Sequence, residues 1–162
     1  MTTTTSAMSP ESRVWIYHSD RPFTAQEIEA LNQDLKAFVA QWAAHQIPLT
    51  ADAMVLHDRF IAIMVDEKLN GASGCSIDAS VHFMQKLAQK YNCSLFNRML
   101  FATMIDGELK SIDKSEFAQL YQSGAINDET LVFDTLVPTK EKLESEFLKP
   151  LRESWHKRML RL

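Results

Sequence analysis

The stretch NGASGCSID, from Asn70 to Asp78, gathers the residue types of a small anion-binding site. It holds two of the four glycines of the chain and one of its two cysteines. Glycine reaches backbone angles that other residues avoid, so successive N–H groups here could converge on a negative charge. Serine or aspartate can cap the helix that follows, and a helix N-terminus attracts anions. The expected ligand-binding residues of this loop are Gly71, Ser73, Gly74, Ser76 and Asp78.

Cys75 offers a second chemistry within the same loop. The field at a helix N-terminus favours the thiolate, which is the nucleophilic form of cysteine. His82 lies one helical turn after Asp78, so that carboxylate could orient the imidazole ring. A catalytic pair of Cys75 as nucleophile and His82 as base is therefore the enzyme alternative, and whether the chain is an enzyme stays open. The plainer alternative is a strand-to-helix connection that contains an inert thiol.

Well-known phosphate and serine motifs are absent from this loop. The phosphate loop G-x-x-x-x-G-K-[ST] needs lysine after its second glycine, but Gly74 is followed by Cys75 and Ser76. The G-x-S-x-G pattern of serine hydrolases fails because Gly74 directly follows Ser73. Cys75 and Cys93 form no CxxC pair and match no zinc spacing. We expect neither a metal site nor a cofactor.

Arginines near the ends of expected strands are weaker candidates for anion binding. Arg21, Arg59 and Arg98 could converge on a carboxylate or phosphate, which guanidinium groups bind through paired hydrogen bonds. Single arginines at strand ends are more often simply solvated, so the sequence leaves both interpretations open.

The C-terminal end is basic and aromatic. From Lys149 onward it has five cations against the single acid Glu153, which gives this end a net charge of +4 and the remainder −8. Cations complement the negative end of a terminal helix, or they form a surface for a second copy of the chain or another protein. His156 and Arg158 complete the expected ligand-binding residues if this end approaches the loop.

Composition predicts a soluble cytoplasmic protein. The 162 residues are 46% hydrophobic and 23% charged, which is ordinary for a globular domain, and no apolar run approaches the roughly 18 residues of a membrane span. A net charge of −4 argues against nucleic-acid binding. The Thr- and Ser-rich residues 1–12 predict a disordered tail, and residues 13–162 predict one α+β domain. The expected partner is a small anionic ligand, without nucleic acid or membrane.

The elements that would position the loop follow from hydrophobic periodicity. Val14 to Asp20 alternates as a strand does, and Thr24 with Glu27 forms a capping box that begins a helix extending toward Ile47-Pro48. The apolar runs 53–56 and 60–65, joined by His57, Asp58 and Arg59, predict a hairpin. A second helix follows the glycine loop, with Val81, Met84, Leu87, Ala88 and Tyr91 facing inward.

The second half of the chain predicts shorter elements. Asp106-Gly107 supplies the positive φ angles of a hairpin turn, and a short helix from Asp113 ends near Gly124. Residues 130–138 are expected to be extended, and residues 139–162 helical with a break at Pro150. The order β-α-β-β-α-β predicts a ferredoxin-like α+β core with an extra strand and a C-terminal helical segment.

Three stretches together resemble a known family. They are VWIYHSDRPFT near the start, GASGCSIDASVHFM in the middle, and LVPTKEKLESEFLKPLRESWHKRML at the end. The chain is similar there to a family of uncharacterised bacterial proteins often labelled "ABC transporter ATPase". The resemblance implies that Cys75 and His82 matter together with the end segment Ser154, Trp155, His156 and Arg158, and it brings no established catalytic residues.

Overall fold

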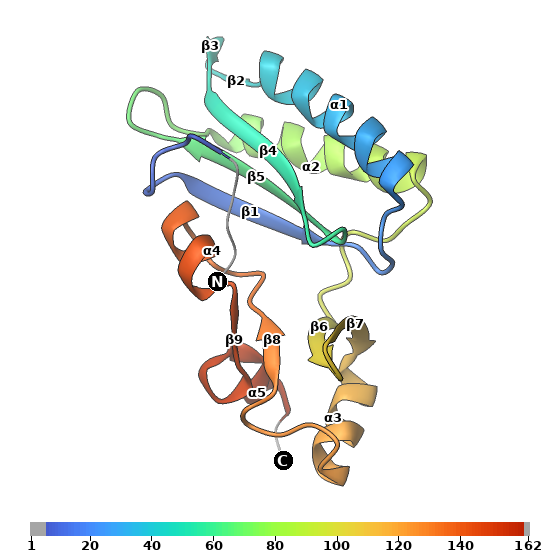
Figure 1. The fold of residues 1–162 in the computed structure, drawn as a ribbon. Helices are drawn as coiled ribbons and strands as arrows, with labels where there is room; N and C mark the ends of the chain where they lie inside the picture. Colours follow the sequence, from blue (N-terminus) through green and yellow to red (C-terminus); the bar gives the residue numbers. More distant parts are fainter. Residues whose placement is uncertain (1–5, 161–162) are drawn as a thin grey trace.

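Two antiparallel sheets organise residues 6–160, the part of the chain that the computed structural model describes (Figure 1). The first sheet has the order β1-β5-β4. Two long helices, α1 and α2, lie together over one of its faces (Figure 1). The bounds are β1 Arg13–His18, α1 Ala25–Gln41, β4 Thr50–Leu56, β5 Phe60–Asp66 and α2 Gly74–Lys90.

The second sheet has the order β7-β6-β8-β9 and comes from the second half of the chain. Short helices surround it (Figure 1). The strands are β6 Leu100–Ile105, β7 Glu108–Asp113, β8 Leu131–Phe133 and β9 Leu148–Pro150. The helices are α3 Lys114–Ser123, α4 Lys140–Glu146, the 3-10 turn η1 Leu151–Glu153 and α5 Trp155–Leu160. The predicted α+β class is confirmed.

Strand β5 lies at the centre of the first sheet and is apolar on both faces, as its nearly continuous hydrophobic run predicts. Ile61, Ile63 and Val65 pack beneath α1 and α2. Phe60, Ala62 and Met64 alternate with them and pack against residues of the second sheet and α4. A third cluster fills the space between the second sheet, α3 and α5. The two sheets are thus joined by a shared apolar layer.

The strongest local signals are confirmed. Thr24 caps α1, and its hydroxyl and the Glu27 carboxylate each accept from the other's backbone N–H. Asp106 and Gly107 have φ angles of 52° and 78° in the turn between β6 and β7. Gly124, at φ 80°, ends α3 in the left-handed conformation. Each signal is complete within a few neighbouring residues, so no distant contact can override it.

Helix α1 ends at Gln41, earlier than its periodicity predicts. Trp42 leaves the helix, and its indole N–H donates to the Ser76 carbonyl of α2 at 2.8 Å. The next residues form a small hairpin of β2, Ala43–Ala44, and β3, Ile47–Pro48. Asn70 holds this hairpin by donating to the carbonyls of both strands. Contacts with a distant segment therefore end the helix.

The ferredoxin-like order is not confirmed. The first three strands follow it, but β6, expected beside β1, pairs with β7 and β8 in the other sheet. Other segments contact β1 and the residues just after it instead. The Val14 N–H donates to the Pro138 carbonyl, and the Asp20 N–H donates to the Ser94 carbonyl. The chain after α2 therefore begins beside β1 and then leaves for the second sheet.

The C-terminal end also differs from the predicted broken helix. Pro150 belongs to β9, where it pairs with Leu131 of β8. Proline lacks the N–H of an interior helical residue but is tolerated on an edge strand, and β9 is an edge of its sheet. Arg161 of the predicted basic end lies outside the described residues.

Residues 1–5 of the expected tail also lie outside the described residues. The remainder of that segment contacts the domain, since the Pro10 and Ser12 carbonyls accept from Glu141 and Lys140 at the start of α4. Within residues 6–160, no helix has the combined length and apolar character needed to cross a membrane.

Candidate functional site

The glycine-rich loop does not adopt the backbone conformation that the sequence suggests. Gly71 and Gly74 have no positive φ; the described glycines that do are Gly107 and Gly124. Ser73 is the N-cap of α2, and its hydroxyl accepts from the Ser76 N–H while the Ser76 hydroxyl accepts from the Ser73 N–H. The loop is a capped helix start, and its amides do not converge through left-handed glycines.

A carboxylate of the protein itself occupies part of the loop. Glu67 accepts a hydrogen bond from the Ala72 N–H at 2.9 Å, and its Oε2 lies 3.2 Å from where a Cβ on Gly71 would stand. The amides of Gly74 and Cys75 have no acceptor among residues 6–160. Those two amides could meet an anion, but Glu67 beside them would repel it.

Cys75 and His82 are not brought into contact. Both side chains are exposed on α2. Seven residues at a rise of about 1.5 Å separate them by about 10 Å along the helix axis, too far for a direct hydrogen bond. Asp78 is exposed on the same helix. The arrangement therefore lacks the contact between nucleophile and base that thiol catalysis requires.

Helix α5, which contains His156 and Arg158, lies with the second sheet and away from α2 (Figure 1). His156 is 1% exposed, and its ring stacks on Trp155 with centroids 3.7 Å apart. Its Nδ1 is 2.6 Å from the Ser154 hydroxyl, and burial lowers its pKa to about 4. Arg158 is exposed. His156 is thus a core residue and does not approach the glycine loop.

A polar cluster that the motifs do not reveal lies where β1 ends against the second sheet. His18 is the last residue of β1, Arg59 lies in the turn between β4 and β5, and Ser111 lies in β7. His18 Nε2 is 2.7 Å from the Ser111 hydroxyl. Arg59 Nη1 donates to the same oxygen at 2.6 Å. Ser111 is therefore held between an imidazole and a guanidinium.

The turn that carries Arg59 has an uncommon backbone. His57 and Asp58 have φ angles of 51° and 56°, a conformation that costs non-glycine residues about 1–2 kcal/mol each. The Phe23 N–H donates to the Asp58 carbonyl at 2.7 Å, and the Ser19 N–H donates to the Arg59 carbonyl at 2.9 Å. These bonds join the turn to the segment after β1, so Arg59 and His18 are positioned together.

The electrostatics of the cluster are unusual for an arginine site. His18 is 8% exposed, and burial, reinforced by the Arg59 cation, lowers its pKa to about 4. The imidazole is consequently neutral at neutral pH. Burial also lowers the pKa of Arg59, although Asp20 acts in the opposite direction. Among residues 6–160, no carboxylate oxygen lies within 4.0 Å of the Arg59 guanidinium.

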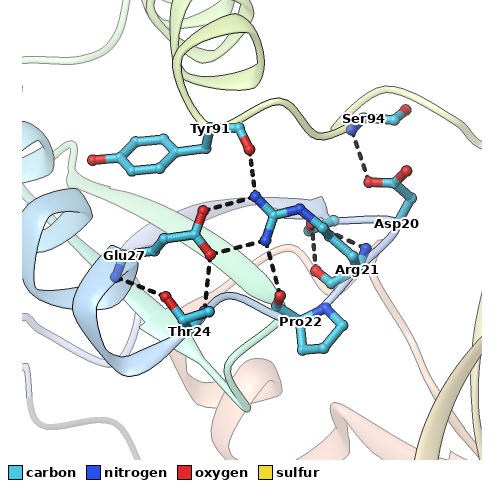
Figure 2. A network of polar contacts seen from close by, with 8 residues as sticks. Asp20, Arg21, Pro22, Thr24, Glu27, Tyr91 and Ser94 are labelled. Atoms are coloured by element: carbon cyan, nitrogen blue, oxygen red, sulfur yellow. Dashed lines mark hydrogen bonds and ion pairs between the residues drawn. The ribbon is translucent and has the colours of Figure 1, made fainter.

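Arg21 gives a direct contrast, because its charge is fully engaged (Figure 2). Its guanidinium donates to both carboxylate oxygens of Glu27, at 2.9 and 2.7 Å, and to the Tyr91 carbonyl. The hydrogen bond from Arg21 lowers the pKa of Glu27 to about 2. Asp20 and Ser94 bind each other beside this network. Arg21 thus joins the start of α1 to the end of α2. The third arginine considered from the sequence, Arg98, is exposed in the segment before β6.

A second polar group within the second sheet is internally complete. Asp134 accepts from Lys149 Nζ at 2.8 Å and from the Trp155 indole and the Leu136 N–H at 2.9 Å. All these groups satisfy one another, which is typical of a structural contact.

One feature of the sequence could have indicated the cluster of His18, Arg59 and Ser111. In β1 the residues Val14, Ile16 and His18 share a face by strand alternation, so His18 is a polar residue at an apolar position. No group of three or more metal-ligating side chains occurs within residues 6–160. Comparison of the chain with family models, with curated proteins and with solved structures found no match.

Proposed function

We propose that the protein binds a small anionic ligand, through a carboxylate or phosphate group, at Arg59, Ser111 and His18. The observation that supports this proposal is the half-buried Arg59 guanidinium, which has no carboxylate within 4.0 Å among residues 6–160. A charge withdrawn from water is costly unless a group of opposite charge accompanies it. Ser111 satisfies one donor of Arg59 but carries no charge, and the Asp20 carboxylate acts on Arg59 from beyond 4.0 Å. An external anion would place a negative charge in direct contact with the guanidinium.

The chemistry of the cluster suits such a ligand. Guanidinium presents a planar fork of N–H donors that matches two oxygens of a carboxylate or phosphate. Ser111 is half exposed, so a ligand can reach it from solvent, and its hydroxyl can donate as well as accept. His18 lies behind them and is buried, which limits competition from water. A neutral imidazole can also take up a proton when an anion binds beside it.

The Gly71–His82 segment remains a second location for the same function. The unpaired amides of Gly74 and Cys75 at the start of α2 support it, and the Glu67 carboxylate opposes it. The two locations would bind the same class of ligand, but different mutations should abolish binding at each. Mutations can therefore separate them.

The test compares the thermal midpoint in phosphate, sulfate or acetate with the midpoint in chloride at matched ionic strength. Because sulfate and phosphate stabilise most proteins nonspecifically, the informative quantity is the difference between variants. We expect Arg59→Gln to remove the anion-specific increase. The control Arg98→Gln, which removes an exposed arginine, should keep it. The double variant Gly71→Ala, Gly74→Ala should also keep it.

Two results would contradict the Arg59 site. One is an anion-specific increase that survives in Arg59→Gln and disappears in the glycine double variant, which would transfer the function to the loop. The other is an equal increase in wild type and all variants, which would show only the nonspecific effect of the salt. The glycine variant should fold normally, since neither position has a positive φ and Gly74 has open space around it.

The two other functions expected from the sequence stay predictions. A thiol-dependent activity of Cys75 with His82 is supported only by the exposure of the sulfur at the start of α2. Alkylation of Cys75 no faster than that of a small free thiol would count against it. A partner surface at the C-terminal helix would have to use exposed residues such as Arg152 and Arg158, because Leu160 and His156 are buried. Cytoplasmic location also stays a prediction.

A further inference from the structure

Ser111 and His18 have the mutual geometry of a nucleophile and its general base. The distance of 2.7 Å between the Ser111 hydroxyl and His18 Nε2 is a short hydrogen bond. Proton transfer to a base requires contact at this range. The contact is made across the interface between the two sheets, so both residues are fixed by strands and by the packing around them.

One placement of the protons suits transfer from Ser111 to His18. The Ser111 oxygen already accepts from Arg59, which leaves its own proton available for His18 Nε2. The buried imidazole is neutral and can accept that proton. A backbone hydrogen bond with Leu100 also acts on the His18 ring. Acceptance of a proton by Nε2 requires the tautomer that carries its proton on Nδ1. This is the tautomer in which histidine serves as a base toward serine.

Arg59 supplies the third component of an acyl-transfer site. Its Nη1 is 2.6 Å from the atom that would attack, so it lies beside the place where a carbonyl oxygen would become negative. Donors aimed at developing charge in a site shielded from water usually contribute the largest share of catalysis. A carboxylate or phosphate bound at Arg59 would resemble that oxyanion.

We propose that Ser111 transfers acyl groups from a small ester or thioester, with His18 as general base and Arg59 as oxyanion donor, an inference that rests on the anion-binding function proposed above. The Ser111 oxygen forms a bond to the substrate carbonyl carbon while its proton passes to His18 Nε2. The bond to the leaving alcohol or thiol then breaks, and that group takes the proton from His18. Water releases the acyl group by the reverse steps, giving its proton through His18 back to Ser111.

Access favours the serine as the reacting group. Ser111 is half exposed on β7, an edge strand of the second sheet, whereas His18 is buried behind it. Substrate can therefore reach the hydroxyl while bulk water is kept from the base.

The test uses a fluorophosphonate probe on the full chain, with peptide mass spectrometry to locate the adduct. Serine oxygen attacks phosphorus and fluoride leaves, so the probe reports an activated hydroxyl. We expect an adduct at Ser111 and none at the exposed Ser123, which serves as an internal reference. His18→Gln should lower the labelling rate about 100-fold, the usual contribution of a general base. The matched control His82→Gln changes an exposed histidine and should have no effect.

An adduct absent from Ser111, or formed there no faster than at Ser123, would overturn the proposal. Labelling of Ser111 that is unchanged in His18→Gln would overturn it too, because the serine would then lack its base. Failure of the acyl-transfer proposal can be distinguished from failure of the anion-binding proposal. An anion-specific thermal shift lost in Arg59→Gln, without labelling of Ser111, would leave a binding site that performs no acyl transfer.

Discussion

Lowering the pH from 7 to 5 should destabilise the protein through two buried histidines. Burial lowers the pKa of both His18 and His156 to about 4, from an ordinary value of 6.5. In the unfolded chain both return to the ordinary pKa, so between about pH 4 and 6.5 the unfolded state binds more protons than the folded state. The stabilising contribution is complete above pH 6.5 and is lost as the pH falls toward 4.

The magnitude follows from the difference between those pKa values. A change of one pKa unit is worth about 1.4 kcal/mol, so each histidine accounts for about 3 kcal/mol over the whole window. At pH 5 the unfolded histidine is nearly all protonated and the folded one is mostly neutral. The loss relative to pH 7 is then about 2 kcal/mol per residue and about 4 kcal/mol for the pair. That is a large part of a typical domain stability of about 5–15 kcal/mol.

Urea unfolding between pH 5 and pH 7 measures the effect. The quantity compared is the slope of the unfolding free energy against pH, because His156→Gln will also lose packing at every pH. We expect the slope in His156→Gln to fall to about half of the wild-type value, and the exposed His82→Gln to keep it. An unchanged slope in His156→Gln, or a wild-type stability that is level between pH 7 and 5, would refute the assignment of buried neutral histidines.

Two further changes test other parts of the fold. Lys149→Met would leave the Asp134 carboxylate without its cation in a mostly buried position, so urea unfolding should show a loss of about 3–5 kcal/mol, and adding Asp134→Asn should recover part of it. Gly124→Ala should cost about 1–2 kcal/mol because φ is 80°, whereas Gly74→Ala, with no positive φ and open space, should be neutral or stabilise by up to about 1 kcal/mol.

Elements whose cause is local could be predicted from the sequence. The capping box of Thr24 and Glu27 begins α1 at the expected residue, and Asp106-Gly107 makes the expected turn. In both cases the groups that form the bonds are only a few positions apart, so their geometry depends little on the remainder of the chain. The central position of β5 likewise required only its own nearly continuous run of apolar side chains.

Features that depend on distant partners could not be predicted in this way. The end of α1 is set by the Trp42 indole on Ser76, 34 positions away, and Pro150 joins a strand because Leu131 is there to pair with it. The predicted left-handed backbone of the glycine loop was wrong for a related reason. Glycine permits a left-handed conformation but does not require it, and Glu67 and Ser73 accept hydrogen bonds from the amides of Ala72 and Ser76.

The candidate site of His18, Arg59 and Ser111 depends on contacts between distant segments, so a search for short sequence motifs does not find it. His18 ends β1, Arg59 lies in the β4–β5 hairpin and Ser111 in the β6–β7 hairpin, and His18 and Ser111 are 93 positions apart. Their contact exists because β6 and β7 leave the first sheet and pack against it, which is the departure from the ferredoxin-like order. The departure from the ferredoxin-like order, which the sequence did not predict, is therefore also the arrangement in which Ser111 of the second sheet meets His18 of the first.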